Sequence, residues 1–159
     1  MTIAAGSPQL ELELGVSYGL SRRGLPAPTS FRRWVTATLA GRIRRADLAL
    51  RLVDADEGLA LNRHYRGMDH ATNVLSFPAE LPPGVELPIL GDIVLCAPVV
   101  AREAREQGKS LQHHYAHLTV HGVLHLLGFE HEDAREAEAM ELLERQILAG
   151  LGINDPYRD

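Results

Sequence analysis

Hydrophobic and polar residues alternate in several short stretches of the chain, and this pattern predicts strands. Leucines alternate with glutamates from residue 10, which indicates a strand over 10–18 with one solvent-exposed face. Leucines at every second position indicate another strand over 48–52, and apolar runs at 73–77 and 92–96 are typical of strands. The segment 78–88 holds four of the nine prolines, so we expect an exposed loop there.

Helical periodicity and end signals predict the remaining elements. Thr29 or Ser30 can cap the first helix, and Asp54 with Glu57 resembles a capping box. Ser110 can cap the helix that carries most of the histidines. The predicted helices cover 29–42, 54–65, 98–107, 110–128 and 133–148. This order of elements favours one α+β domain, over 1–159, with a roughly four-stranded sheet.

Composition sets broad limits on the class of protein. A chain of 159 residues is long enough to bury one core, and its single cysteine, Cys96, excludes a disulfide framework. We find neither a signal-peptide pattern at the start nor an apolar run of membrane-spanning length. We therefore expect a cytoplasmic protein that does not associate with a membrane. The net charge of −5 does not favour nucleic-acid binding, although arginines cluster within 22–45.

The most informative segment is HGVLHLLGFEH, over 121–131. His121 and His125 are four residues apart, so they lie on one face of a helix. Gly128 can end that helix in a left-handed turn and bring His131 to the same point. Three imidazoles with an open fourth position are typical of a catalytic zinc site, so the segment predicts one Zn²⁺ per chain. The thiol of Cys96 is an alternative fourth ligand, but a cysteine in a strand is more often a small core residue.

The spacing of these residues matches the metzincin pattern H-E-x-x-H-x-x-G-x-x-H except at one position. Metzincins carry a glutamate after the first histidine, as the general base of peptide hydrolysis. Here that position is Gly122, which cannot accept a proton. A metallopeptidase, or another zinc hydrolase with a base from elsewhere, is therefore a less favoured alternative.

Three further histidines precede the predicted ligands on the same helix. Successive steps of four residues drift by about 40° around a helix, so the row turns away from the metal. We expect His117 to pack or to hydrogen-bond beside the site, and His113 and His114 to face solvent.

With these motifs in view, the chain resembles the YbeY family of bacterial endoribonucleases and rRNA maturation factors. The resemblance runs from about residue 59 to 157. It is carried by LNRHYRGMDHATNVLSFP, LGDIVLC, HLTVHGVLHLLGFEH and NDPY. The chain departs from the family signature at Phe129, where tyrosine is usual, and at Glu130, where aspartate is usual.

The resemblance implies a mixed sheet with about five or six helices and a metal site on a central helix. It also implies a single-strand-specific endoribonuclease in 16S rRNA 3′-end processing and ribosome quality control. Its partners would be single-stranded RNA and small-subunit components, and we expect a monomer. Arg66 matches the family's functional arginine, and its guanidinium suits phosphate. From the residues alone, an ion pair of Arg66 with Asp69 or another surface carboxylate is equally possible. A non-catalytic ribosome-assembly factor, in which zinc is mainly structural, is an alternative function.

Overall fold

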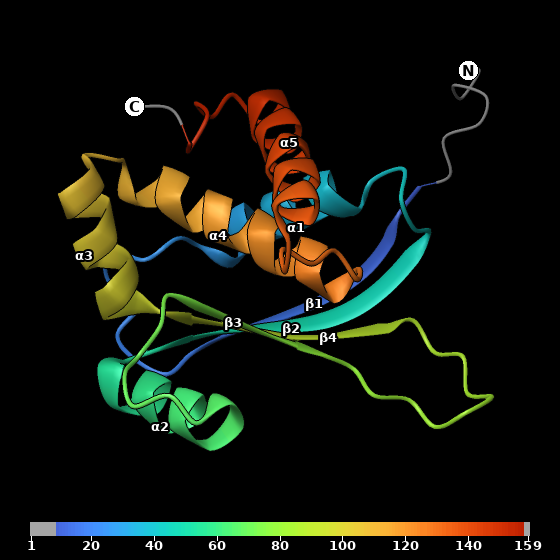
Figure 1. Ribbon diagram of the computed structural model, residues 1–159, viewed down its shortest axis with the longest axis horizontal. Coiled ribbons are helices and arrows are strands. Elements are labelled where there is room, and N and C mark those ends of the chain that lie inside the picture. The colour runs from blue at the N-terminus through green and yellow to red at the C-terminus, as the bar shows by residue number, and fades with distance from the viewer. Residues whose placement is uncertain (1–8, 158–159) are drawn as a thin grey trace.

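A computed structural model describes residues 9–157 of the chain (Figure 1). Its strands are β1 (Glu11–Tyr18), β2 (Arg45–Val53), β3 (Val74–Pro78) and β4 (Ile89–Cys96). Its helices are α1 (Pro28–Leu39), α2 (Ala55–Arg66), α3 (Ala97–Gln107), α4 (Leu111–Leu126) and α5 (Ala134–Gly150). Within the described range, no helix combines the length and the apolar character needed to cross a bilayer.

The strands form one mixed sheet in the order β1-β2-β4-β3. β1 and β4 both run parallel to β2, whereas β3 runs antiparallel to β4. β3 is therefore a short edge strand, and it lies on the side of the sheet where α4 ends. This arrangement confirms the predicted α+β class, with four strands in a mixed sheet and five helices among residues 9–157.

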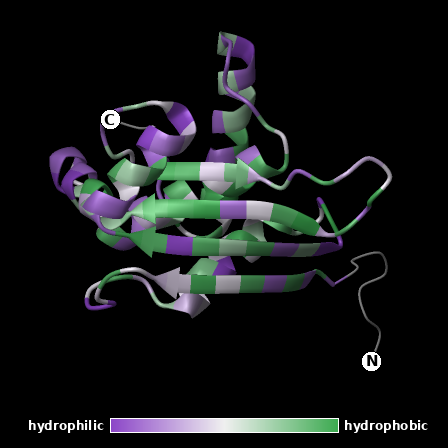
Figure 2. Cartoon of the chain, turned by 90° about the horizontal axis from the view of Figure 1, so that it is seen from below, coloured by the Kyte–Doolittle hydropathy of each residue, from purple (hydrophilic) through white to green (hydrophobic). Residues whose placement is uncertain are grey.

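Helices cover the two faces of the sheet unequally: α1, α4 and α5 lie over one face, and α2 lies under the other (Figure 1). The larger core fills the space below α1, α4 and α5, where Phe31 packs edge to face against both Trp34 and Tyr115. A smaller cluster on the α2 side includes Leu75 and the buried Cys96, so Cys96 is the core residue expected. The central strands are covered on both faces, and Figure 2 shows that they are largely hydrophobic (green), with a few polar positions.

Side-chain caps begin three of the helices as the sequence predicts. Asp54 accepts a hydrogen bond from the Glu57 amide at 2.9 Å, and Ser110 accepts one from the His113 amide at 3.1 Å. Asp133 caps α5 in the same way. Each cap satisfies an amide that the helix itself leaves without a partner, which places the start of each helix at a defined residue.

The start of α1 differs from the prediction. Neither Thr29 nor Ser30 is its cap; Ala27 occupies that position without a side-chain hydrogen bond, and Pro28 stands in the first turn. Proline suits this position because its missing N–H has no partner to lose there and its φ already fits a helix. The helix also ends before residue 42, because the chain turns at Gly41 with a φ of 79°.

Helix α4 approaches the sheet closely at Gly122. A Cβ atom at this position would lie 3.2 Å from Ser76 Oγ and 3.3 Å from the side chain of Ile93. Ser76 Oγ also donates a hydrogen bond to the Gly122 carbonyl at 3.2 Å. Since successive residues are about 100° apart around a helix, this contact turns His121 and His125 away from the sheet's centre and toward its β3 edge.

Candidate metal centre

Three histidines converge at the end of α4. His121 and His125 project from the helix, and the turn after it brings His131 back, because Gly128 adopts a φ of 101°. One ring nitrogen of each histidine lies within 4.8 Å of one in the other two. The Nε2 atoms of His121 and His125 are 3.1 Å apart. The structure therefore brings together the three residues that the sequence pattern selected, and such a group can hold a metal ion.

The three rings differ in burial. The side chains of His121 and His125 are 20% and 17% exposed, whereas His131 is exposed. Burial lowers the pKa of His125, and the neighbouring His121 and His131 lower it further. A lowered pKa keeps the His125 imidazole neutral at physiological pH, and neutral imidazole is the form that binds metals.

A carboxylate from α5 contacts two histidines of α4, His117 and His121, beside the converging group. Glu144 is fully buried, and its Oε1 lies 3.1 Å from His121 Nδ1 and 2.9 Å from His117 Nε2. Burial by itself would raise the pKa of Glu144, but hydrogen bonds from His117 and His121 lower it to about 2. Glu144 is therefore an ionised acceptor, and His117 makes the hydrogen bond expected for it.

A cavity of about 390 Å³ opens in front of the three histidines. Residues of β3 and of the turn after α4 line it. The lining also includes Arg66, at the end of α2, and Glu130, in the turn. The Arg66 side chain makes no ion pair with Asp69 among the described residues, since Asp69 pairs with Arg63 instead. Arg66 and the histidines, which are far apart in the sequence, thus face the same space.

The position that holds the general base in metzincins does not line this cavity. Gly122 is buried against the sheet, so the missing carboxylate leaves no gap beside the histidines. Glu130 lies closer, with its Oε2 at 3.9 Å from His125 Nδ1, and it is half-exposed. Glu130 therefore keeps a carboxylate at the cavity wall.

We expected both His113 and His114 to face solvent, and this is right for His113 but wrong for His114. His113 is exposed, but His114 is buried at 3% and lies 2.9 Å from Glu103 through its Nε2. Glu103 also accepts a hydrogen bond from Asn73 at 3.0 Å. His114 is buried because α3 packs beside α4 at this turn, a contact between helices that the periodicity of one helix does not reveal.

Sequence reasoning missed Glu144, which contacts His117 and His121. The acidic run over 130–144 suggests a solvated face, and Glu144 looks like one more member of it. A signal was nevertheless present. Glu144 lies four residues after Met140 and four before Leu148, and both of these are buried on α5. A carboxylate within such an apolar stripe must have a partner inside the protein.

The comparison with solved structures agrees with this fold. The solution structure of TM1509 from Thermotoga maritima superposes with a TM-score of 0.58 and 23% sequence identity. The match covers 92% of this chain and 99% of that one, so the similarity extends to nearly all elements of the fold.

Comparisons of sequence assign the family. A family model described as Endoribonuclease YbeY matches residues 27–152. An endoribonuclease YbeY from Stenotrophomonas maltophilia is 71% identical over 152 residues, which are 93% of this chain and 94% of that protein. One from Xanthomonas campestris is 69% identical with the same coverage. The chain therefore belongs to the Endoribonuclease YbeY family.

Proposed function

We propose that this protein is a zinc-dependent endoribonuclease that cleaves single-stranded RNA during maturation of the 16S rRNA 3′ end. The observation that carries the proposal is the shared cavity, in which three convergent histidines face Arg66. The names of the 71% and 69% identical relatives support RNA as the substrate. A role in ribosome quality control, with small-subunit components as partners of a cytoplasmic monomer, is part of the same proposal.

Three imidazole ligands and the spacing of one histidine pair are compatible with zinc. Two nitrogens on one tetrahedral zinc lie about 3.3 Å apart, because each Zn–N bond is roughly 2.0–2.1 Å. The 3.1 Å between His121 Nε2 and His125 Nε2 is close to this value. His121, His125 and His131 would hold the ion at the wall of the cavity. When bound, zinc supplies Lewis acidity toward a phosphodiester and makes a water molecule more acidic.

Arg66 and Glu130 supply the remaining chemistry of this proposal. The guanidinium of Arg66 can donate two parallel hydrogen bonds to phosphate oxygens and stabilise the charge that grows on them in the transition state. Glu130 is the carboxylic acid in the cavity lining and is placed to accept or donate a proton. His117 is a poorer candidate, because its Nε2 is already bonded to Glu144.

A metallopeptidase is not favoured by this geometry. The base of that mechanism would stand at position 122, which packs on Ser76 and Ile93. Without it, the arginine beside the histidines is better suited to a phosphate than to a peptide carbonyl.

The test is single-turnover cleavage of a single-stranded RNA by variants of Arg66, with an identical-sequence DNA as a second substrate. Arg66→Ala should slow RNA cleavage by about 10²–10³-fold, since a preorganised donor is lost. Arg66→Lys should recover part of the rate, because it keeps the charge without the planar fork. Arg63→Ala, on the same helix but paired with Asp69, is the control and should cleave normally. Normal rates in both Arg66 variants, with zinc content unchanged, would refute a catalytic role for Arg66. Absence of RNA cleavage by the zinc-loaded wild type would instead favour a non-catalytic assembly factor.

A further inference from the structure

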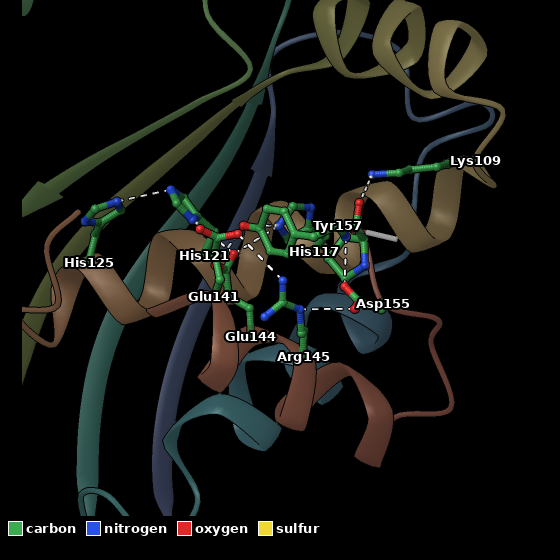
Figure 3. Close-up of polar contacts among 10 residues, drawn as sticks. Lys109, His117, His121, His125, Glu141, Glu144, Arg145, Asp155 and Tyr157 are labelled. Carbon is green, nitrogen blue, oxygen red and sulfur yellow. Dashed lines mark hydrogen bonds and ion pairs between the residues drawn. The ribbon is translucent and has the colours of Figure 1, made fainter. Parts of the chain in front are cut away.

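The buried Glu144 determines which nitrogen of His121 is free. A carboxylate only accepts hydrogen bonds, so the His121 Nδ1 that lies 3.1 Å from Glu144 must carry the proton. The other nitrogen, Nε2, is then unprotonated and points toward His125 Nε2 (Figure 3). This is the tautomer that a metal ligand requires.

Glu144 has a third partner from the end of the described chain. The hydroxyl of Tyr157 donates to Glu144 Oε2 at 2.9 Å, on the side of the carboxylate away from His121. It also lies 3.2 Å from His117 Nε2. Three donors from two distant segments therefore surround one carboxylate that is closed to solvent.

The segment that carries Tyr157 is held in place by contacts of its own. Asp155 accepts from the Tyr157 amide at 2.8 Å and pairs with Arg145 Nε at 3.1 Å. The Arg145 guanidinium also lies over the Tyr157 ring, 5.3 Å from its centroid. Lys109 Nζ donates to the carbonyl of Pro156 at 3.0 Å (Figure 3). These contacts tie the segment to α5 and to the loop before α4.

Packing alone does not explain a charge at position 144. Burying a carboxylate costs several kcal/mol unless its hydrogen bonds compensate, and an apolar residue of similar size often serves a core better. Here the carboxylate lies behind one ring of the metal centre. The other rings have no carboxylate at hydrogen-bond distance among the described residues; the closest contact is Glu130, 3.9 Å from His125 Nδ1.

We propose that Glu144 and Tyr157 are positioning residues of the metal centre, and that residues 153–157 thereby act as a brace for His121. The inference rests on the proposed metal binding and adds residues to it. Glu144 orients the His121 ring and strengthens its Nε2 as a ligand, and Tyr157 fixes the orientation of the Glu144 carboxylate. Residues 153–157 are thus coupled to metal affinity, although they contribute none of the three proposed ligands.

The test measures zinc affinity by competition with a chromogenic chelator, in the wild type and in three variants. Glu144→Gln should weaken zinc binding by roughly 10–100-fold, the usual loss when an outer partner of a metal ligand is removed. Tyr157→Phe should weaken it in the same direction by a smaller factor. Glu138→Gln removes a charge from an exposed position of the same helix and should change the affinity less than twofold.

Two further measurements distinguish positioning from simple packing. Melting curves of the metal-free proteins report stability, and the visible spectrum of the cobalt(II) forms reports ligand geometry. We expect altered spectra for Glu144→Gln and Tyr157→Phe. Lower melting temperatures with unchanged zinc affinity and spectra would overturn the inference, and Tyr157→Phe decides if Glu144→Gln does not fold. A wild type that binds no zinc would overturn the metal assignment itself.

Discussion

The histidines of α4 share one helix but have different surroundings. His113 is exposed, His114 is buried against Glu103, and His121 lies between Glu144 and the other two converging rings. The chemistry of an imidazole depends on these neighbours, because they decide which nitrogen carries the proton. Only His121 and His125 of this helix belong to the converging group.

His131→Ala should remove most of the bound zinc. Two imidazoles from one helix make an incomplete site, and the third ring comes from the turn after it. His113→Ala is the matched control, since it removes an exposed ring from the same helix and should retain stoichiometric zinc. Elemental analysis of both variants after gel filtration checks this, and full zinc in His131→Ala would contradict the proposed ligand set.

Helix α4 depends on its glycine for the distance to the sheet. Because Gly122 faces Ser76 and Ile93, a larger residue requires these side chains, or the helix itself, to move. Interiors are closely packed, so a shift of this kind also moves the residues on the neighbouring face. The histidines therefore depend on a contact that does not touch them.

Gly122→Glu should destabilise the protein by several kcal/mol, because it buries a carboxylate against the sheet without a partner. It should not create a peptidase. Gly150→Glu is the control: a Cβ at this position meets nothing within 4 Å, and we expect a change within about 1 kcal/mol. Urea unfolding of the metal-free proteins measures both values. Equal stability of the two variants would show that α4 can move away from the sheet at little cost.

In the whole molecule, the proposed ion would join α4 to the turn after it, and a hydrogen bond joins α5 to the same centre. His121 and His125 come from α4, His131 from the turn after it, and Glu144 from α5. An ion bound only by the folded arrangement stabilises that arrangement by mass action.

Zinc should therefore raise the melting temperature of the metal-free protein. A free concentration of one hundred times the Kd adds about 2.7 kcal/mol, which corresponds to roughly 5–10 °C for a protein of this size. Magnesium should have little effect, because it prefers oxygen ligands. Differential scanning calorimetry with a zinc titration measures the shift, and His131→Ala should lose most of it. The same shift in that variant would place the binding elsewhere.

The affinity for RNA should depend only weakly on salt concentration, because the chain carries a net charge of −5. Arg66 is the one lysine or arginine among the described residues that line the cavity, so few phosphates are neutralised there. Each phosphate contact on a single strand contributes about −0.7 to the slope of log K against log salt concentration. We expect a slope smaller in magnitude than about 2. Arg33 is exposed on α1, so Arg33→Ala is the control and should leave the slope unchanged. A slope near −4, measured by fluorescence anisotropy, would indicate a broad basic surface instead.

Local signals in the sequence were sufficient for much of the fold. Alternating leucines marked β1 and β2, and Asp54, Ser110 and Asp133 marked the helix starts, because capping and pleating involve residues near one another in the chain. The HGVLHLLGFEH segment contains all three converging histidines for the same reason. An i, i+4 pair and a glycine turn are local geometry, so the candidate ligands could be named without a structure.

Contacts between distant segments were decided only by the tertiary structure. The burial of His114 depends on α3, the cavity of Arg66 depends on where α2 ends beside β3, and Glu144 depends on the packing of α5 against α4. A charged residue in an acidic stretch looks solvated until a neighbouring helix covers it. What a side chain does when it is buried is set by its partners, and those partners are brought together only by the packing of the helices on the sheet.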